Sequence, residues 1–417
     1  MKSELDTLMH ARNFDAILVF GNAENNPPMT YLTGGGHVSG ATLIKKRGEP
    51  AVIFCNGMER DEAAKSKLKV RLYDEYPWQD LIKEADGDNA LMAALRLKNI
   101  FIDMDINGRV GIYGHTDLGG MFATLTHFQK IMPSVELIGE TRENSLFMVA
   151  METKDLAEVE RIRQMGKVTT DVVGLTAEFL TSCSVDSDQV LLNVDGSQLK
   201  LGEVKARINL WLAERGAVPS EGFIFAIGHD AGVPHSQGNP DDLMCLGKTI
   251  VFDIYPQEPG GGYFYDFTRT WSLGYATPES QRLYDQVHRA YNHIVENLDL
   301  NAKFKDYQVM VCEIFEKDGH PTQRTQKAPL AGYIHSLGHG VGLNIHERPW
   351  SGLTATDDNL LKPGIVMTIE PGLYYPDLGM GFRIEDTYWV NPNGKFELLA
   401  EYPYDFVLPM KNWQAVH

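Results

Sequence analysis

Apolar positions in the first 150 residues alternate between short continuous runs and the three- and four-residue spacing of helices. The short runs predict strands at Ala16–Phe20, Ala41–Lys45, Ala51–Phe54, Val70–Tyr73, Ile100–Met104 and Val135–Ile138. The helical spacing between them predicts helices at Met58–Lys67, Trp78–Lys98 and Leu118–Ile131. This alternation is typical of a layered α/β domain. Because the region has no tight cluster of metal-ligand residues, we expect it to shape an entrance or an oligomer contact.

The pattern changes near residue 151. A charged stretch from Thr153 carries apolar residues at helical spacing and predicts a long helix, with further helices at Gly202–Arg215, Pro278–Asn297 and Asp306–Lys317. Strands are predicted at Gly222–Ile227, Thr249–Tyr255, Tyr263–Leu273, Val366–Glu370 and Gly381–Val390. Short turns rich in glycine and proline join them, which favours antiparallel pairing. We therefore predict an α/β domain over residues 1–150 and an α+β domain over 151–417, with helices packed on a curved antiparallel sheet.

Length and composition agree with two globular domains. The chain has 417 residues, 43% of them hydrophobic and 23% charged. A formal net charge of −18 argues against nucleic acid or an anionic membrane as a partner. No stretch approaches the roughly 18 apolar residues that span a bilayer, and the N-terminus lacks a signal-peptide pattern. Four widely spaced cysteines indicate reduced thiols, so we expect a cytoplasmic protein.

Five residues of metal-ligand type follow in a fixed order in the C-terminal half: Asp253, Asp266, His339, Glu370 and Glu385. Each lies in a predicted strand or at its edge. Two antiparallel hairpins could bring the four carboxylates to one point. One such residue alone is more often a solvated side chain, but burying several unpaired carboxylates costs several kcal/mol each unless cations neutralise them. The group as a whole therefore predicts a dinuclear metal hydrolase.

The donor types narrow the choice of metal. Oxygen-rich ligation with one imidazole suits Mn²⁺, Co²⁺, Zn²⁺ or Fe²⁺ better than softer ions. Two such ions about 3.5–4 Å apart can share a water and lower its pKa to about 7, which makes it a nucleophile. Gly338, Gly340 and Gly342 would let the backbone around His339 pass close to the cluster.

The segments around these residues resemble the pita-bread metallopeptidases, a family that includes aminopeptidase P, prolidase and, more distantly, methionine aminopeptidase. The resemblance is carried by the stretches HSLGHGVGLNIHERP, TIEPGLY and FRIEDTYWV. Residues 1–150 look like the creatinase/prolidase N-terminal domain, and residues 151–417 look like the catalytic domain.

The resemblance implies a role for each donor. Asp253 would hold one metal alone, Asp266 and Glu385 would bridge both metals, and His339 and Glu370 would complete the second. Glu370 would also act as the general base.

Four further residues match positions of the family that face the substrate. His235 would hydrogen-bond the scissile carbonyl or the developing oxyanion, and His346 would do so from the opposite side. His335 would contact the leaving group or pack behind His339. Arg383 would orient Glu385 or bind a substrate carboxylate.

The function that the resemblance implies is hydrolysis of a small peptide before proline, by an Xaa-Pro dipeptidase with two divalent ions. Mn²⁺ is the first expectation for these ions, with Co²⁺ and Zn²⁺ as alternatives, and a homodimer is expected. The alternatives are an Xaa-Pro aminopeptidase, a metal hydrolase of the same fold acting on a small amide, and a binding module without catalysis. Creatinase-like members lose metal ligands, whereas this chain keeps all five.

Two features depart from the family pattern: Tyr255 replaces a small residue, and the inserted PQEPGGGY lengthens the connection between Asp253 and Asp266. Ser236 stands where an aromatic residue often follows the pocket histidine.

Overall fold

A computed structural model describes residues 4–36 and 38–413, and the chain divides into two compact units. The first contains the residues up to Met151 together with Gly260–Gly262. The second contains Glu152–Pro259 and the residues from Tyr263 onward. Within the described ranges, no helix combines the length and apolar content needed to cross a bilayer. All four cysteines are free thiols, as their spacing predicts.

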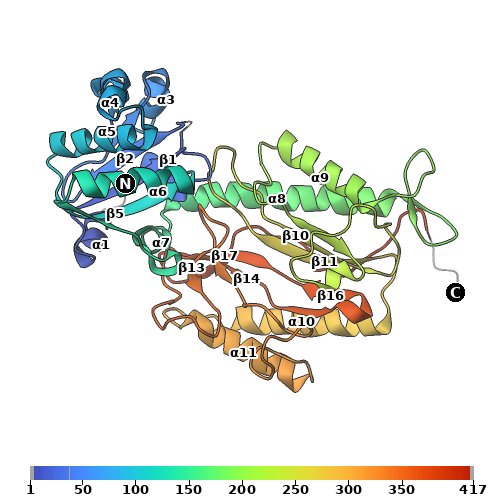
Figure 1. Cartoon of the computed structure of the whole chain (residues 1–417). Coiled ribbons are helices and arrows are strands. Elements are labelled where there is room, and N and C mark those ends of the chain that lie inside the picture. The colour runs from blue at the N-terminus through green and yellow to red at the C-terminus, as the bar shows by residue number, and fades with distance from the viewer. Residues whose placement is uncertain (1–3, 37, 414–417) are drawn as a thin grey trace. The chain divides into compact units, whose positions relative to one another are not determined.

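The first unit is built on a six-stranded sheet with the strand order β4-β3-β2-β1-β5-β6. Figure 1 labels β1, β2 and β5 of this sheet. Its strands are β1 (Ala16–Gly21), β2 (Ala41–Lys46), β3 (Val52–Cys55), β4 (Lys69–Leu72), β5 (Gly108–His115) and β6 (Val135–Ile138). β2 runs antiparallel to β1 and β3, whereas the β1–β5, β3–β4 and β5–β6 pairs are parallel. Strands β2, β3 and β4 therefore lie in sequence order on one side of β1, and β5 and β6 lie on its other side.

Helices complete the layers of this unit, which confirms the predicted α/β class. They are α1 (Leu5–Ala11), α2 (Pro27–Thr33), α3 (Arg60–Ala64), α4 (Trp78–Glu84), α5 (Asn89–Asp103), α6 (Leu118–Ile131) and α7 (Leu146–Met151). Alternate residues of β1, such as Leu18, share one core with α5 and α6. In that core the rings of Phe101 and Phe128 meet edge to face, with centroids 5.0 Å apart.

Three predicted elements of this unit have different boundaries or types. The predicted strand Ile100–Met104 is wrong, because these residues form the last turn of α5 and its C-cap, with Ile100 on the buried face. Helical burial there outweighs the local β propensity. The predicted helix Trp78–Lys98 is split between α4 and α5, since Asp86 and Gly87 both have positive φ angles. The predicted helix Met58–Lys67 ends early, at Ala64.

Strand β5 was not predicted because glycines interrupt its apolar pattern. Both glycines have a packing reason in the structure. A Cβ on Gly111 would lie 2.9 Å from the ring of Phe14, and one on Gly114 would lie 2.1 Å from the carbonyl oxygen of Phe20. Glycine therefore permits a close approach to β1 and its neighbours.

The second unit holds two sheets of mainly antiparallel strands. One has the order β19-β11-β10-β9 and contains β9 (Ile224–Ile227), β10 (Thr249–Ile254), β11 (Phe267–Leu273) and β19 (Val407–Leu408). The other has the order β13-β12-β14-β17-β18 and contains β12 (His339–Gly340), β13 (Glu347–Trp350), β14 (Val366–Ile369), β17 (Asp386–Val390) and β18 (Phe396–Leu398). Two further pairs are β7 (Ser184–Val185) with β8 (Leu191–Leu192), and β15 (Gly372–Tyr375) with β16 (Met380–Arg383). An isolated antiparallel bridge between Thr268 and Glu385 links the two sheets.

Four long helices cover these strands, which confirms the predicted α+β class. Helices α8 (Leu156–Ser182) and α9 (Leu201–Glu214) lie on one side of β10 and β11, and α10 (Pro278–Glu296) and α11 (Phe304–Lys317) lie on the other (Figure 1). The long helix predicted from Thr153 is α8, whose N-cap Asp155 accepts hydrogen bonds from two backbone N–H groups of the first turn. Gly166 of α8 packs on Tyr265, where a Cβ would lie 2.6 Å from the ring.

The strand predicted over Gly381–Val390 is two strands in the structure. β16 ends at Arg383 and β17 begins at Asp386. The break leaves Glu385 on the bridge to Thr268, between the two sheets.

Candidate metal centre

The five predicted donors come together at strand ends of the second unit. Asp253 lies in β10 opposite Thr268 of β11, and Asp266 directly precedes β11. Glu370 follows β14, and Glu385 precedes β17, the antiparallel partner of β14. His339 opens β12, which pairs with β14. All five line one cavity of about 290 Å³, so both predicted hairpins are present and bring their carboxylates to the same place.

The imidazole of His339 is held with one nitrogen free to bind. Its Nδ1 lies 3.1 Å from the carbonyl oxygen of Gly340, so Nδ1–H donates there and Nε2 is left as an acceptor. Burial lowers the pKa of His339 well below its usual value, and the neighbouring His346 lowers it further. The neutral Nε2 nevertheless lies 3.5 Å from Asp266 Oδ2 and 3.4 Å from Glu370 Oε1. Acceptors face acceptors here, which favours a cation between them.

Close backbone packing holds this strand in position. A Cβ on Gly338 would lie 2.2 Å from the carbonyl oxygen of Thr368, and one on Gly340 would lie 1.9 Å from that of Arg348. The predicted need for glycines beside His339 is therefore explained by contacts with β13 and β14.

The carboxylates are buried against one another. Burial raises the pKa of Glu370 well above its usual value, and repulsion from Glu385 raises it further. Burial likewise raises the pKa of Asp266, with added repulsion from Glu385 and Asp253. For Glu385, burial followed by repulsion from Asp253 raises the pKa from 4.5 to about 8. Positive charge at this point would remove the repulsion.

Two carboxylate oxygens in the cluster also lack hydrogen bonds. Asp253 Oδ1 and Glu385 Oε1 are buried and have no partner within the described part of the chain. Asp266, His339 and Glu385 each offer a ligand atom, and these atoms lie within 4.8 Å of one another. Hard oxygen donors with one imidazole are the ligands that Mn²⁺ and similar divalent ions accept. The residues present therefore fit a divalent metal centre.

The buried guanidinium of Arg383 holds the carboxylates of the cluster in position, either directly or through Thr268. Arg383 contacts Asp253 through Nη2 and donates from Nη1 to the Tyr374 hydroxyl at 2.6 Å. Its Nε donates to Thr268 Oγ1 at 3.2 Å, and the Thr268 hydroxyl donates to Glu385 Oε2 at 2.7 Å. Of the two roles predicted for Arg383, this geometry favours orientation of the carboxylates, because the guanidinium is already occupied by protein groups.

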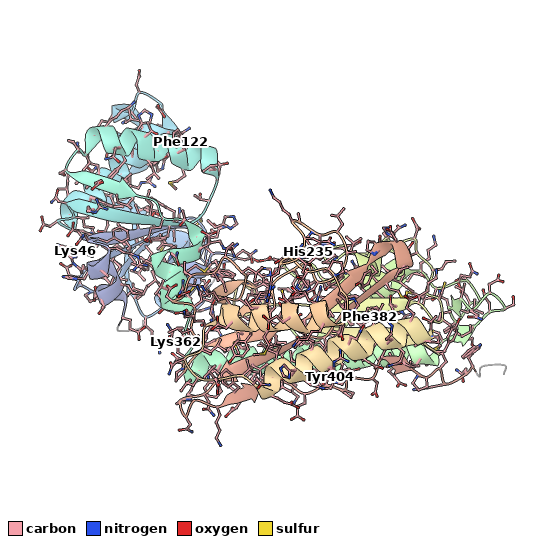
Figure 2. All side chains as sticks on the ribbon, turned by 90° about the horizontal axis from the view of Figure 1, so that it is seen from below. Lys46, Phe122, His235, Lys362, Phe382 and Tyr404 are labelled. Carbon is pink, nitrogen blue, oxygen red and sulfur yellow. The ribbon has the colours of Figure 1, made fainter. Side chains whose placement is uncertain are left out.

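The three other predicted histidines line the same cavity. His335 Nδ1 lies 2.7 Å from the carbonyl oxygen of Ser336, and its Nε2 is buried without a protein partner among the described residues. Burial, then Arg383, lowers the pKa of His335 to about 3, so the ring is neutral. His346 packs on His339 with ring centroids 4.3 Å apart. His235, labelled in Figure 2, is exposed although it lines the cavity.

Some contributors to the site were not predicted. Glu221, Ile224, Pro234, Ser336, Ile345 and Trp350 also line the cavity. Ser336 and Ile345 are neighbours of motif histidines, whereas nothing in the sequence marks Glu221.

Gln308 of α11 also supports the site and is fully buried. Its Oε1 accepts from the backbone N–H of Leu337 at 2.5 Å, and its Nε2 donates to the carbonyl oxygen of His335 at 3.2 Å. It fixes the loop that carries His335, a role that only the fold reveals.

A second buried arginine supports the strands behind the cluster. Arg269 Nη1 donates to the carbonyl oxygens of Thr268 and Glu385, both at 3.0 Å. Its Nη2 pairs with Asp386 Oδ1 at 2.9 Å, and Asp386 also accepts from the hydroxyl of Tyr404 at 2.8 Å. Tyr404 lies near α10, as does Phe382 of β16 (Figure 2). The backbone on both sides of the Thr268–Glu385 bridge is therefore tied to one guanidinium.

Comparison with known proteins identifies the family. Residues 160–392, more than half of the chain, match metallopeptidase family M24. The chain belongs to this family. Residues 2–142 match the creatinase/prolidase N-terminal domain, so the M24 metallopeptidase has the two-domain organisation of the pita-bread enzymes that its motifs resemble.

Relatives of this M24 metallopeptidase match either most of its length or about half of it. It is 24% identical to the Xaa-Pro dipeptidase of Pyrococcus horikoshii, over 94% of each chain. It is 32% identical to an uncharacterized peptidase of Staphylococcus epidermidis, over 87% of this chain and 88% of that protein. The Xaa-Pro dipeptidase of Pyrococcus furiosus is 35% identical over 46% of this chain, a match that spans about half (51%) of that relative.

Solved structures share the fold of the M24 metallopeptidase. The Xaa-Pro dipeptidase of Bacillus anthracis superposes with a TM-score of 0.76 at 18% identity, over 97% of this chain and 98% of that one. The X-Pro aminopeptidase of Thermotoga maritima gives 0.73 at 20% identity, over 96% and 99%.

The raised carboxylate pKa values predict how stability responds to metal removal. Without cations, folded Glu385 keeps a proton that the unfolded chain releases, because its pKa is about 8 instead of 4.5. Stability of the chelated protein should therefore fall as pH rises from about 4.5 to 8, and stabilisation by added Mn²⁺ should grow over the same interval. Melting temperatures at pH 5.5, 7 and 8.5, with chelator and with Mn²⁺, test this.

Glu385→Gln is the matched control for this titration. In the chelated state its melting temperature should fall less between pH 5.5 and 8.5 than that of the wild type. An equally steep fall in the variant would contradict the assignment to Glu385.

Proposed function

We propose that this M24 metallopeptidase is a dinuclear metal-dependent hydrolase that cleaves Xaa-Pro peptide bonds, most specifically an Xaa-Pro dipeptidase. The observation that carries the proposal is the single cavity in which the four predicted carboxylate donors, a neutral imidazole acceptor and three further histidines converge. These four carboxylates, with Glu221 also on the cavity wall and Arg383 as the one guanidinium that lines it, favour binding of two divalent cations. Relatives named Xaa-Pro dipeptidase that match over much of the chain support the substrate class.

In this proposal the donors divide between the two ions. Asp253, Asp266, His339, Glu370 and Glu385 would hold these ions, with Asp253 assigned to one ion, His339 and Glu370 to the other, and Asp266 and Glu385 shared between them. When bound, divalent ions supply Lewis acidity and activate water as a nucleophile. Mn²⁺ is the ion we propose first, with Co²⁺ and Zn²⁺ as substitutes that the same donors accept.

The protein groups perform the proton transfers and the positioning. Glu370 accepts a proton from the attacking water and delivers it to the proline nitrogen as the C–N bond breaks. His235 and His346 donate hydrogen bonds to the scissile carbonyl as negative charge develops on its oxygen. His335 presents Nε2 as an acceptor on the leaving-group side, because its Nδ1–H is committed to the carbonyl oxygen of Ser336.

The size of the cavity supports a short substrate. A volume of about 290 Å³ corresponds to roughly ten water molecules at about 30 Å³ each, enough for a dipeptide. The solved structures of the same fold include both dipeptidases and an X-Pro aminopeptidase, so the aminopeptidase is the second candidate.

The test is a substrate panel on purified protein that has been chelated and then reloaded with Mn²⁺, Co²⁺ or Zn²⁺. We expect hydrolysis of Ala-Pro and Met-Pro, and none of Ala-Ala. Cleavage of Ala-Pro-Ala alone would assign the aminopeptidase instead. No cleavage of any peptide by metal-loaded protein would reject both and favour a small non-peptide amide; the binding module would be favoured only if amides also failed.

We propose that Tyr255 determines which substrate residue is preferred at the position before proline. Its side chain lines the cavity two residues after Asp253 and is half-buried. Tyr255→Ala should enlarge the cavity and raise kcat/KM for Phe-Pro relative to Ala-Pro by about tenfold, in line with pocket-size discrimination. Tyr255→Phe keeps the ring and should leave this ratio nearly unchanged. Equal ratios in both variants would contradict a steric role.

We also propose a homodimer, since two-fold symmetric dimers are the commonest oligomers of soluble proteins. Light scattering on the metal-loaded protein tests it.

A further inference from the structure

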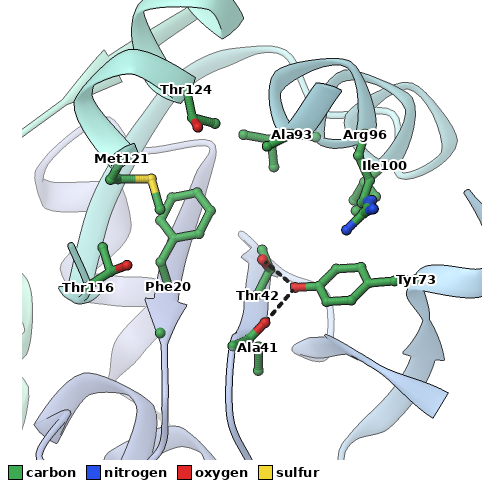
Figure 3. Close-up of a pocket in the computed structure, with 13 residues that line it drawn as sticks. Phe20, Ala41, Thr42, Tyr73, Ala93, Arg96, Ile100, Thr116, Met121 and Thr124 are labelled. Atoms are coloured by element: carbon green, nitrogen blue, oxygen red, sulfur yellow. Dashed lines mark hydrogen bonds between the residues drawn. The ribbon is translucent and has the colours of Figure 1, made fainter. Parts of the chain in front are cut away.

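The first unit contains a cavity that the peptidase reaction does not use. Its volume is about 220 Å³. Residues from β1, β2, α5 and α6 line it, together with Tyr73 after β4 and Thr116 after β5. Figure 3 shows Phe20 and Met121 on one side and Arg96 and Tyr73 on the other. One wall is therefore apolar and the opposite wall carries a cation.

The cavity lies where ligands bind in open α/β sheets. β1, β3, β4 and β5 all run in one direction, so Gly21, Tyr73 and Thr116 lie at or just beyond the carboxyl ends of strands. The strand order reverses at β1, because the chain fills one side of it with β2–β4 and the other with β5 and β6. Connections that leave in opposite directions open a crevice at this edge, which is the usual ligand site of such sheets.

Arg96 is the unusual residue of this cavity. Its guanidinium carbon lies 5.0 Å from the centre of the Tyr73 ring, and its Nε is buried without a hydrogen-bond partner within residues 4–36 and 38–413. In the same ranges no carboxylate lies within 4.0 Å of it, and its Nη2 lies 3.6 Å from the Met92 sulfur. A buried N–H without an acceptor is costly, and burial lowers the pKa of Arg96, although Tyr73 and Asp74 offset part of this shift. A bound carboxylate would supply the missing acceptors in the geometry that arginine prefers.

The other residues that line the cavity restrict the class of ligand that can bind. Thr42, Thr116, Thr124 and Tyr73 offer hydroxyl groups, although the Tyr73 hydroxyl already donates to Thr42 Oγ1 at 2.8 Å (Figure 3). Among the described residues that line the cavity there is no aspartate or glutamate. The ammonium of a free amino acid would therefore be desolvated here without a counter-charge. A volume of about 220 Å³ corresponds to roughly seven water molecules at about 30 Å³ each, which limits the ligand to a small molecule.

We propose that this cavity binds a short monocarboxylic acid with an apolar body and no ammonium group. Its carboxylate pairs with Arg96 and its body packs against Phe20, Leu97 and Met121. The site is separate from the metal centre, since all of its residues lie in the first unit.

The test uses three matched probes on the metal-loaded full chain: 3-methylbutanoate, its neutral amide, and valine, which is the same acid with an ammonium group. Methyl NMR of labelled methionines gives a readout at the cavity itself, with the Met121 signal assigned by Met121→Leu. We expect a saturable shift of the Met121 signal with 3-methylbutanoate, and binding at least roughly tenfold weaker, a loss of about 1.4 kcal/mol, for the amide and for valine.

Two variants separate a carboxylate site from a general apolar cavity. Arg96→Gln should abolish the difference between acid and amide, whereas Arg60→Gln, at an exposed arginine of the same unit, should preserve it. Ala93→Leu should fill the cavity and abolish binding while Arg96 remains. No saturable shift at Met121, or unchanged acid binding in Arg96→Gln, would overturn the proposal. Neither outcome would bear on Xaa-Pro hydrolysis, which is assayed separately.

Discussion

Replacing Glu370 by glutamine should lower kcat for Ala-Pro by about 10²–10⁴-fold, the usual range for loss of a positioned general acid–base group. Glutamine keeps the size of the side chain and one oxygen atom that can bind a metal ion, but it cannot accept a proton from water. Because the backbone N–H of Glu370 donates to the carbonyl oxygen of Leu337 at 2.7 Å, the substitution should leave the loop in place. Steady-state hydrolysis at saturating Mn²⁺ gives the measurement.

Metal content must be measured alongside, since Glu370 is also a proposed ligand. Glu401→Gln, at an exposed carboxylate of the same unit, is the matched control and should behave as the wild type. A Glu370→Gln protein that binds the full complement of metal and keeps kcat within tenfold of the wild type would exclude Glu370 as the general base.

Replacing Arg269 by methionine should destabilise the second unit by about 3–5 kcal/mol, the range found when one partner of a buried ion pair is removed. Arg269 is 1% exposed and Asp386 is fully buried, so the variant leaves a carboxylate without its cation. The guanidinium also lies 4.2 Å from the ring centre of Phe267 and 4.3 Å from that of Tyr404. Urea unfolding followed by tryptophan fluorescence should report a lower midpoint.

Arg163→Met is the surface control for this experiment. Arg163 pairs with Glu397 at 3.8 Å, and both side chains are more than a third exposed. Such pairs contribute about 0–1 kcal/mol, so its unfolding midpoint should hardly move. Equal effects of the two substitutions would show that the buried pair has no special role in stability.

The five proposed donors could be picked out because each lies in a distinctive sequence motif, and the four carboxylates lie on antiparallel hairpins. The hairpin geometry then determines that the four carboxylates meet, and the structure has both hairpins. The type of most long helices and strands was also predictable, because a buried face repeats apolar residues at a regular spacing in the sequence. Helix α8 begins three residues after the predicted start at Thr153, and α10 nearly coincides with the predicted helix Pro278–Asn297.

What the sequence did not reveal depends on distant contacts. Gln308 and Arg269 are polar residues that would ordinarily be placed on the surface, and only the packed structure buries them. Strand β5 was missed because its glycines look like breaks until Phe14 and Phe20 are seen to occupy the space of their side chains. The orientation of Arg383 toward Asp253 likewise depends on Tyr374, which arrives from β15.

The most direct test of the central proposal is a titration of the chelated full chain with Mn²⁺ while Ala-Pro hydrolysis is followed. The arrangement of Asp253, Asp266, His339, Glu370 and Glu385 around one cavity predicts no hydrolysis without metal, then a rise that levels off at about two ions per chain, as in a two-metal hydrolase. Hydrolysis that persists without metal, or bound Mn²⁺ with no hydrolysis at any ratio, would contradict a metal-dependent Xaa-Pro dipeptidase.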